Sequence, residues 1–278
     1  MRFEKWQALG NDYLIVEADH LPWELTPERI RGLCHVNFGP GGDGVLLLSA
    51  GADGHVATLK IFNPDGSEAE LSGNGAREAA MYLRARGWTA DDDFTIATAA
   101  GTVRPRILDD RNCTMAIGSA TTAGPDWPTG PADGLGTLMI SGVERTFRFV
   151  HVGNPQVTIE FSTVEEVEAL DLPTIGPAIE TDAQFPNRTN VSFWAREGAG
   201  IRARIFERGV GETMSSGTGS SGAAVAAHLA GAGDSLDVRL DGGTLTVKIG
   251  EALELDLTGW AIPVYAAVLA PETVEELS

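Results

Sequence analysis

The chain has 278 residues, 43% of them hydrophobic, and carries a formal net charge of −19 at pH 7. This length allows one large domain or two ordinary ones, with ample chain for a core. The negative charge argues against nucleic acid and anionic membrane surfaces as partners. No run reaches membrane-spanning length and the N-terminus has no signal-peptide pattern, so a cytoplasmic protein is expected.

In chain order, the first half predicts a short series of strands and helices. The predicted elements are strand segments at 6–8 and 13–17, a helix from Pro27 capped by Thr26, strands at 45–48 and 57–62, a helix over 76–84 that Gly87 stops, and a hairpin over 95–106. The second half repeats this plan, and its helix over 220–229 is ended by Gly231. Prolines 125, 128 and 131 are interpreted as the link between the halves.

The two cysteines, Cys34 and Cys113, lie outside any repeated motif. Such residues are typically buried small hydrophobes, and neither a disulfide nor a metal site is predicted from them. The five histidines show no ligand spacing with carboxylates or thiols, so no metal is expected.

A Gly-rich turn occurs twice, as Ser72-Gly73-Asn74-Gly75 and as Ser216-Gly217-Thr218-Gly219, at an offset of 144 residues. Each turn lies between a strand-like segment and an Ala-rich helical one. Other landmarks recur in the same order at offsets of 143 to 146, namely Gly10-Asn11 as Gly153-Asn154, Ile61-Phe62 as Ile205-Phe206, and Val45 as Val191. Two unrelated glycine turns are the simpler alternative, but the shared order and spacing favour an internal duplication.

Each turn opens a helix, whose first backbone N–H groups are unpaired and carry partial positive charge. Two such helix ends facing one another would hold a single carboxylate. Polar residues also lie at the repeated landmarks, and amides and an arginine suit the carboxylate and ammonium groups of an amino acid. Taken singly, each asparagine is better explained as a turn former, but their shared positions in the repeat favour ligand contacts. These residues are Asn11, Asn63, Asn154, Asn190, Glu207 and Arg208.

The motifs as a set resemble the diaminopimelate epimerase family, over nearly the whole chain and in the family's order. The segments that carry the resemblance are Gly10-Asn11-Asp12, Asn63-Pro64-Asp65-Gly66-Ser67-Glu68, Ser72-Gly73-Asn74-Gly75-Ala76-Arg77, Gly153-Asn154-Pro155, Pro186-Asn187-Arg188-Thr189-Asn190-Val191 and Glu207-Arg208-Gly209-Val210-Gly211-Glu212-Thr213.

The resemblance implies an α+β fold of two pseudo-symmetric domains, each a mostly antiparallel sheet wrapped on a central helix, with the active site in the interdomain cleft. We assign residues 1–120 to the first half, with 262–278 returning to it, and 121–261 to the second. The resemblance also implies an isomerase that inverts an amino-acid α-carbon without pyridoxal phosphate or another cofactor, in lysine biosynthesis. Many relatives form homodimers, and these motifs leave the assembly of this chain open.

The chain departs from the family at the two proton-transfer positions. Two cysteines act there on opposite faces of the α-carbon, and in this chain Ser72 and Ser216 occupy both places. Gln156 stands where the family usually carries histidine, Gly44 stands where some relatives carry glutamine, and Glu207 is retained. An aliphatic hydroxyl is a poor base unless an adjacent base activates it.

The resemblance therefore assigns catalytic positions to Ser72, Ser216 and Glu207. Gly73, Asn74, Gly217 and Thr218 are expected to bind the α-carboxylate of diaminopimelate or a similar amino acid. The distal end is expected to contact Asn11, Asn63, Asn154, Asn190 and Arg208. Three explanations of the serines stay open. They are an engineered double Cys→Ser form of an epimerase, a natural branch performing another isomerisation or tautomerisation with Glu207 as base, and a non-catalytic amino-acid binder.

Overall fold

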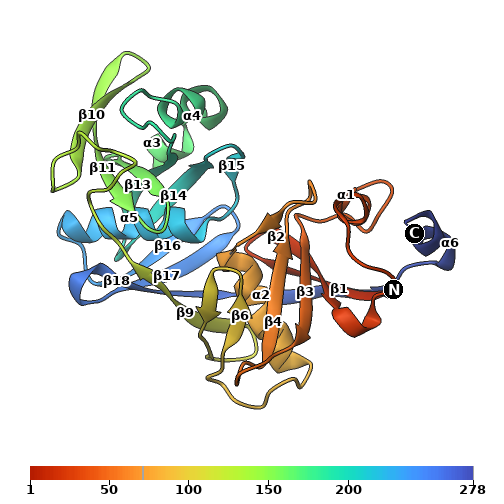
Figure 1. Cartoon of the computed structure of the whole chain (residues 1–278). Coiled ribbons are helices and arrows are strands. Elements are labelled where there is room, and N and C mark those ends of the chain that lie inside the picture. The colour runs from red at the N-terminus through yellow and green to blue at the C-terminus, as the bar shows by residue number, and fades with distance from the viewer. Residues whose placement is uncertain (71, 278) are drawn as a thin grey trace. The chain divides into compact units, whose positions relative to one another are not determined.

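The computed structural model describes residues 1–70 and 72–277. The chain forms two compact units, Met1–Met115 with Gly259–Ser278, and Ala116–Thr258. It passes between them twice, within strands β9 (Asn112–Ser119) and β18 (Glu254–Trp260). Each unit has its own sheet and its own central helix, α2 in the first and α5 in the second (Figure 1).

The first unit is built on a sheet in the strand order β19-β1-β2-β3-β4-β6-β7, with β5 paired to β4. Its strands are β1 (Arg2–Ala8), β2 (Asn11–Glu17), β3 (Val45–Ala50), β4 (Ala57–Phe62), β5 (Glu68–Ala69), β6 (Ile96–Thr98), β7 (Gly101–Val103) and β19 (Ile262–Val268). Its helices are η1 (Ala18–His20), α1 (Pro27–Cys34), α2 (Gly73–Ala85) and α6 (Pro271–Glu276).

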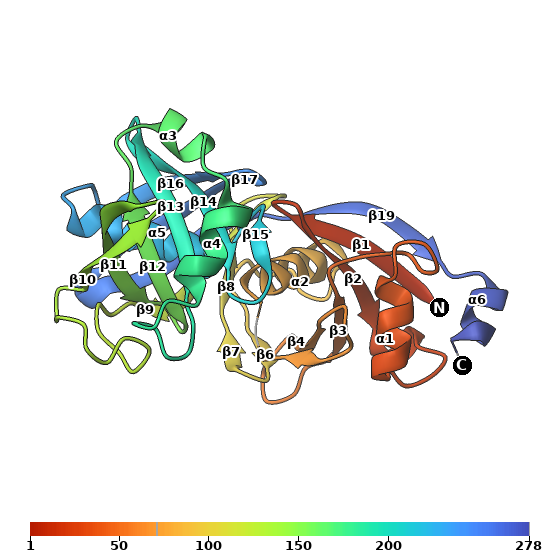
Figure 2. The same ribbon diagram turned by 90° about the horizontal axis from the view of Figure 1, so that it is seen from above.

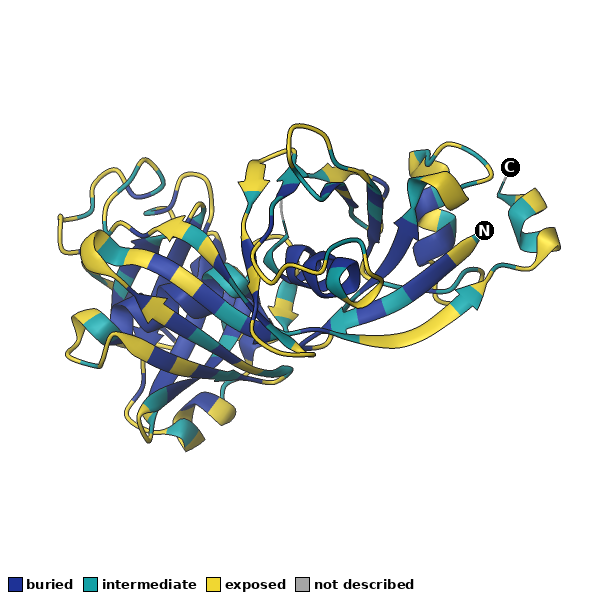
Figure 3. Ribbon diagram, turned by 90° about the horizontal axis from the view of Figure 1, so that it is seen from below, coloured by how far each residue is buried: buried dark blue, intermediate teal, exposed yellow. Residues whose placement is uncertain are grey.

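Helix α2 lies along the inner face of this sheet, and its residues 74–83 are buried (Figures 2 and 3). Helix α1 covers the other face, where Phe3, Leu14 and Val45 pack against Ile30 and Leu33. As predicted, α1 begins after Thr26, whose hydroxyl accepts a hydrogen bond from the Arg29 N–H. The sheet is therefore covered on both faces, and α2 is the central element of the unit.

The second unit has a sheet in the order β10-β11-β12-β13-β14-β16-β17-β18-β9, with β15 paired to β14. Its further strands are β10 (Leu135–Ile140), β11 (Val143–His151), β12 (Pro155–Glu160), β13 (Asn190–Glu197), β14 (Gly200–Glu207), β15 (Gly211–Thr213), β16 (Ser235–Leu240) and β17 (Gly243–Ile249). Its helices are α3 (Val164–Glu168), α4 (Leu172–Glu180), α5 (Gly217–Leu229) and η2 (Glu251–Leu253).

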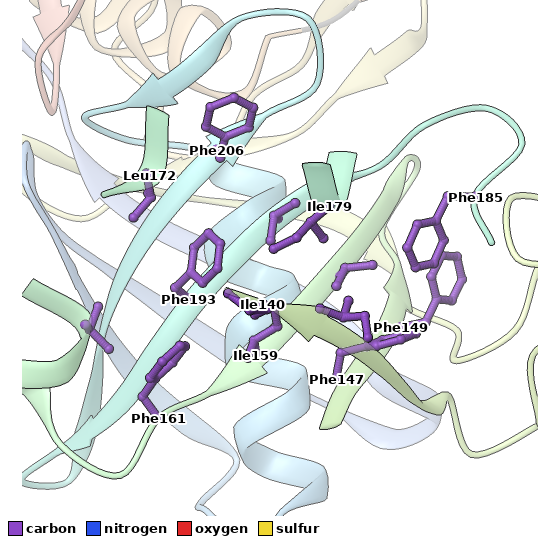
Figure 4. Close-up of a cluster of buried hydrophobic side chains, with 14 of the residues drawn as sticks. Ile140, Phe147, Phe149, Ile159, Phe161, Leu172, Ile179, Phe185, Phe193 and Phe206 are labelled. Carbon is purple, nitrogen blue, oxygen red and sulfur yellow. The ribbon is translucent and has the colours of Figure 1, made fainter. Parts of the chain in front are cut away.

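The core of the second unit lies between its sheet and helices α3 and α4. Phe147, Phe149, Phe185 and Phe193 are buried there among aliphatic side chains (Figure 4). Helix α5 occupies the opposite face, with residues 219–227 buried. Its Gly, Ser and Ala residues suit a helix that strands surround on several sides, because small side chains allow close approach.

Strand register confirms the internal duplication. In both units a parallel pair, an antiparallel pair and a short antiparallel strand follow one another before the central helix. Equivalent pairs are Leu14↔Val45 and Val157↔Val191, Leu46↔Ile61 and Ser192↔Ile205, and Ile61↔Ala69 and Ile205↔Thr213. The fold is thus α+β, with two repeated halves that each wrap a sheet on a helix.

Three sequence predictions need correction in detail. Prolines 125, 128 and 131 lie inside the second unit and do not form the link, because the chain passes between the units within β9 and β18. The central helices begin at Gly73 and Gly217, so the Gly-x-Gly residues lie inside the first helical turn and not before it. The predicted hairpin over 95–106 ends at β7, and β8 (Pro105–Ile107) pairs instead with β9. Pro105 lacks an N–H and cannot extend the β6–β7 ladder.

Cys34 and Cys113 are both buried free thiols, as predicted. Burial raises the pKa of each to about 11, which leaves them neutral and inert. Among residues 1–70 and 72–277, no helix is long and apolar enough to cross a membrane.

Candidate active site

The first half-site lies at the N-terminus of α2. Ser72 is the N-cap, and its Oγ accepts a hydrogen bond of 3.1 Å from the Gly75 N–H. The same Oγ accepts a second bond of 3.2 Å from the Tyr13 phenol, which comes from β2. A Cβ added at Gly73 would meet no atom within 4 Å, so the backbone of this first turn is open to a small ligand.

Tyr13 is held against the backbone of Gly44. The Tyr13 side chain is buried, and a Cβ built at Gly44 would lie 2.7 Å from its ring and 2.2 Å from the Phe62 carbonyl oxygen. A larger side chain does not fit in this space. Position 44 therefore requires glycine, first because of the Phe62 carbonyl oxygen and second because of the Tyr13 ring.

Asn11 is oriented by Asp43. The Asn11 Nδ2 donates to Asp43 Oδ2 at 2.8 Å, and the Asp12 N–H donates to the same oxygen at 3.0 Å. Lys5 pairs with Asp12 at 2.6 Å and braces the loop. This orientation turns the Asn11 carboxamide oxygen away from Asp43, where it can accept a bond from a ligand ammonium group.

Asn63 and Asn74 are used in local structure. Asn63 Nδ2 donates to Ser67 Oγ at 3.0 Å in the turn after β4. Asn74 is buried, and its Oδ1 accepts from Arg77 within α2 at 3.0 Å. For Asn74, the backbone N–H is therefore better placed than the side chain for the expected carboxylate contact.

The second half-site lies at the N-terminus of α5. Ser216 is the N-cap and is buried, and its Oγ accepts a bond of 3.2 Å from the Gly219 N–H. Glu207, at the end of β14, accepts a bond of 2.8 Å from the Thr213 hydroxyl and another from Ser216. The cap geometry matches that of Ser72, but the neighbour of this serine is a carboxyl group.

Burial raises the pKa of the Glu207 carboxyl above its ordinary value of 4.5, and the bonds from Thr213 and Ser216 oppose part of that rise. A carboxyl whose pKa is raised by partial burial is a stronger base than an exposed one.

Asn190 links two loops near this half-site. It is buried, its Nδ2 donates to the Pro155 carbonyl at 2.9 Å, and its Oδ1 accepts from the Arg208 N–H at 2.8 Å. The Arg208 guanidinium donates to the Asn187 carbonyl. Asn190 thus positions the Glu207-Arg208 segment through its amide, an arrangement that sequence spacing did not reveal.

Asn154, Gln156 and Thr218 form a third set of contacts at the start of α5. Asn154 Nδ2 donates to Thr218 Oγ1 at 3.3 Å, and Gln156 Nε2 donates to Asn154 Oδ1 at 2.6 Å and to Thr218 Oγ1 at 3.2 Å. Gln156 is fully buried. It orients the two residues expected to bind substrate, and an amide at this position does not titrate.

The structure thus connects the predicted residues of the second unit by hydrogen bonds, while those of the first unit lie in separate local networks. Sequence reasoning missed Tyr13, Asp43 and Thr213. The available signal for Tyr13 was its place 143 residues before Gln156, within the repeated motif. Within the described part of the chain, no group of three or more His, Cys, Asp or Glu residues is arranged to hold a metal ion.

Solved structures resemble this chain over nearly its full length. A phenazine biosynthesis protein of the PhzF family from Bacillus anthracis superposes with a TM-score of 0.70 at 19% identity, covering 97% of this chain and 99% of that one. A hydroxyproline epimerase from Agrobacterium vitis superposes with a TM-score of 0.65 at 17% identity, covering 99% and 94%. At these identities the likeness establishes the fold.

Sequence comparison establishes the family. The sequence model described as diaminopimelate epimerase matches residues 3–123 and 148–258. Diaminopimelate epimerase 2 of Nostoc is 37% identical and covers 93% of this chain and 92% of its own length. The diaminopimelate epimerase of Thioalkalivibrio sulfidiphilus is 35% identical, covering 95% and 97%. The chain therefore belongs to the diaminopimelate epimerase family, which is a family of isomerases.

Proposed function

We propose that this protein is a cofactor-independent isomerase that inverts the α-carbon of diaminopimelate or a closely related amino acid, with Glu207 as its base. Family membership supports the reaction class. The single observation that carries the proposal is the half-buried Glu207 carboxyl, which accepts a bond of 2.8 Å from Thr213 and a further hydrogen bond from Ser216, the cap of α5. Interconversion of diaminopimelate isomers would place the protein in lysine biosynthesis.

In this proposal the two half-sites act on one substrate. The backbone N–H groups at Gly73-Asn74 and Gly217-Thr218 hold the α-carboxylate, because helix N-termini favour anions. Asn11 and Asn63 receive the distal ammonium group through their carboxamide oxygens. Arg208 pairs with the distal carboxylate, and Asn154 and Asn190 hold the surrounding loops.

A serine hydroxyl is a poor base by itself, and in this proposal Glu207 is the adjacent base that it needs. The Ser216 hydroxyl can take the α-proton only if its own proton leaves at the same time. The hydrogen bond to Glu207 provides that route, so that the carboxylate becomes the final proton acceptor. Burial raises the pKa of the Glu207 carboxyl, which makes its carboxylate a stronger base than an exposed one.

A second candidate is a non-catalytic amino-acid binder. It is favoured by one observation, that Ser72 and Ser216 each cap a helix and are satisfied by backbone N–H groups. Serine caps of this kind are common and require no catalytic role.

Solvent exchange at the α-carbon separates the two candidates. We expect LL- and meso-diaminopimelate to lose the α-proton signal in deuterated buffer, followed by proton NMR, with binding measured in parallel by calorimetry. Binding without exchange would identify the binder, and absence of binding would remove diaminopimelate as the ligand. The double variant Ser72→Cys/Ser216→Cys is the matched control, because it restores both thiols and should epimerise if the pocket is intact.

A further inference from the structure

The hydroxyl of Ser72 is saturated as an acceptor. A serine hydroxyl offers one proton to donate and two lone pairs to accept with. The Gly75 N–H takes one lone pair at 3.1 Å, and the Tyr13 phenol takes the other at 3.2 Å. The proton of Ser72 is therefore free to point to a third partner, and Ser72 is set up to give a proton.

Ser216 has the opposite arrangement. Its hydroxyl donates to the Glu207 carboxyl, and its oxygen accepts a bond of 3.2 Å from the Gly219 N–H. Among residues 1–70 and 72–277 no second donor to this oxygen is found, so one lone pair can receive a proton. The two serines have the same backbone geometry, but their neighbours give them opposite hydrogen-bonding polarity.

Tyr13 is placed for this contact by packing. The residue is 6% exposed and its ring lies against Gly44, which immediately precedes the strand paired with its own. A buried phenol is stabilised only when its O–H finds a partner, and the Ser72 oxygen is one. A phenylalanine would fill the same space, so packing alone does not require the hydroxyl.

We propose that Tyr13 is a positioning residue that supplies the proton which Ser72 delivers to the α-carbon, so that the first unit donates and the second unit removes. This inference rests on the proposed function and deepens it. A phenol, with an ordinary pKa near 10, is a far better proton source at neutral pH than an aliphatic hydroxyl.

The step balances as a relay. The Ser72 O–H bond breaks as its proton forms a C–H bond with the carbanion's electron pair, and the Tyr13 O–H bond breaks as its proton reaches the Ser72 oxygen. On the opposite face, the α-proton goes to Ser216 while the Ser216 proton goes to Glu207. Tyr13 ends as phenolate and Glu207 as neutral acid, and exchange with solvent resets both. The reverse reaction runs the same steps backwards.

The first test needs no substrate. In Ser72→Cys the new thiol can be titrated by its rate of alkylation against pH, because Cys34 and Cys113 are buried and unreactive. Adding Tyr13→Phe should raise the pKa of the new thiol by about one unit, because a donor to the thiolate is lost. In Ser216→Cys, Tyr13→Phe should change nothing, while Glu207→Gln should lower the thiol pKa by removing a like charge. Equal titrations of the thiol in the Ser72→Cys variant, with and without the Tyr13 hydroxyl, would overturn the proposal.

The second test uses turnover. Tyr13→Phe should lower kcat for epimerisation by about 100-fold when Ser72 is present. In the Ser72→Cys background the same change should lower kcat by less than about threefold, because a thiol does not need the phenol. Tyr82→Phe, which removes a phenol that donates to Glu17 near the other end of α2, is the matched control and should leave kcat unchanged.

The outcomes separate this inference from the proposed function. An equal loss in both backgrounds would make Tyr13 merely structural and overturn the inference alone. Absence of turnover in the wild type and in the variant with both thiols would overturn the proposed function and the proton-supply step with it. The thiol titration would still decide whether Tyr13 donates to position 72.

Discussion

The two half-sites share a backbone and differ in the neighbours of the serine. The N-caps have nearly the same conformation, with φ and ψ of −132° and 123° at Ser72 and −146° and 124° at Ser216. In the first unit the titratable neighbour is Tyr13, from the second strand of the repeat. In the second unit the titratable neighbour of the serine is Glu207, the last residue of β14.

At the position equivalent to each of these two titratable residues, the other unit carries an amide. Gln156 is the counterpart of Tyr13, and Asn63 is the counterpart of Glu207 at an offset of 144. The first unit therefore has its titratable residue at the Tyr13 position and an amide at the Asn63 position. The second unit has the amide at the first of these positions and the titratable residue at the second. Duplication preserved the helix cap, while substitutions gave each serine a different titratable neighbour.

The residue that lies beside this position on the neighbouring strand also differs between the two units, as Gly44 in the first and Asn190 in the second. The Tyr13 ring lies beside Gly44, whereas the counterpart Gln156 lies opposite Asn190 in the parallel register. The smaller amide leaves room for Asn190 to reach Pro155 and the Arg208 N–H. In the first unit the large Tyr13 side chain thus lies beside a glycine. In the second unit the side chains of Gln156 and Asn190 share the equivalent space.

The largest effect is expected from a substitution at Glu207, the titratable neighbour of the serine in the second unit. We expect Glu207→Gln to lower epimerisation by about 100- to 10,000-fold, because the base of the second unit is lost. The fold should be retained or slightly stabilised at neutral pH. A carboxyl whose folded pKa is raised loses stability as pH rises above its unfolded pKa, and the amide avoids this. Initial rates and thermal denaturation check both.

Glu212→Gln is the control for this variant. Glu212 belongs to the neighbouring strand β15 and pairs with Arg204. This substitution should leave epimerisation within about twofold of wild type, because a partly exposed ion pair contributes little. Equal rates for Glu207→Gln and wild type would remove Glu207 from the mechanism.

Gly44→Ala tests the packing side of the comparison. The added Cβ would lie 2.2 Å from the Phe62 carbonyl oxygen and 2.7 Å from the Tyr13 ring. We expect a loss of about 3 kcal/mol in the free energy of unfolding, because the backbone oxygen cannot move away cheaply. Urea denaturation measures it. Gly73→Ala, whose Cβ meets nothing within 4 Å, should show no such loss, and equal effects would contradict this account.

The helix caps should respond equally in the two units. Ser72→Ala and Ser216→Ala are each expected to lower the free energy of unfolding by about 1 kcal/mol, since each removes one N-cap hydrogen bond. Ser→Gly at either position should lower it by only a few tenths of that. A much larger effect at one serine alone, in chemical denaturation, would show that the two caps are not equivalent.

The smallest expected effect is a shift in pH dependence. Thr213→Val removes a hydrogen bond that lowers the pKa of Glu207, so that pKa should rise by up to about one unit. Because the base must be ionised, the acidic limb of the kcat/KM profile should move to higher pH. Thr246→Val, which removes an exposed bond to Asp237, is the control. An unmoved limb would assign it to another group.

Local features of the fold were predictable because they depend on neighbours in the chain. The helix from Pro27 with its Thr26 cap, the stops at Gly87 and Gly231, and the buried cysteines follow from short-range patterns and were confirmed. The duplication was also readable, because spacing between motifs survives in sequence. The predicted starts of the two central helices lay too far along the chain, because a Gly-x-Gly run is typical of a loop unless the preceding serine is recognised as the N-cap.

The amino-acid sequence by itself determined the repeated halves, the order of their elements, the two serine-capped helices and the family. Only the tertiary structure decided which side chain lies beside each serine. Tyr13 is 59 positions from Ser72, and strand register together with the space at Gly44 brings them into contact. Asn190 likewise turned inward to join two loops. Such contacts depend on register, packing and burial across distant segments, and a linear pattern carries none of these.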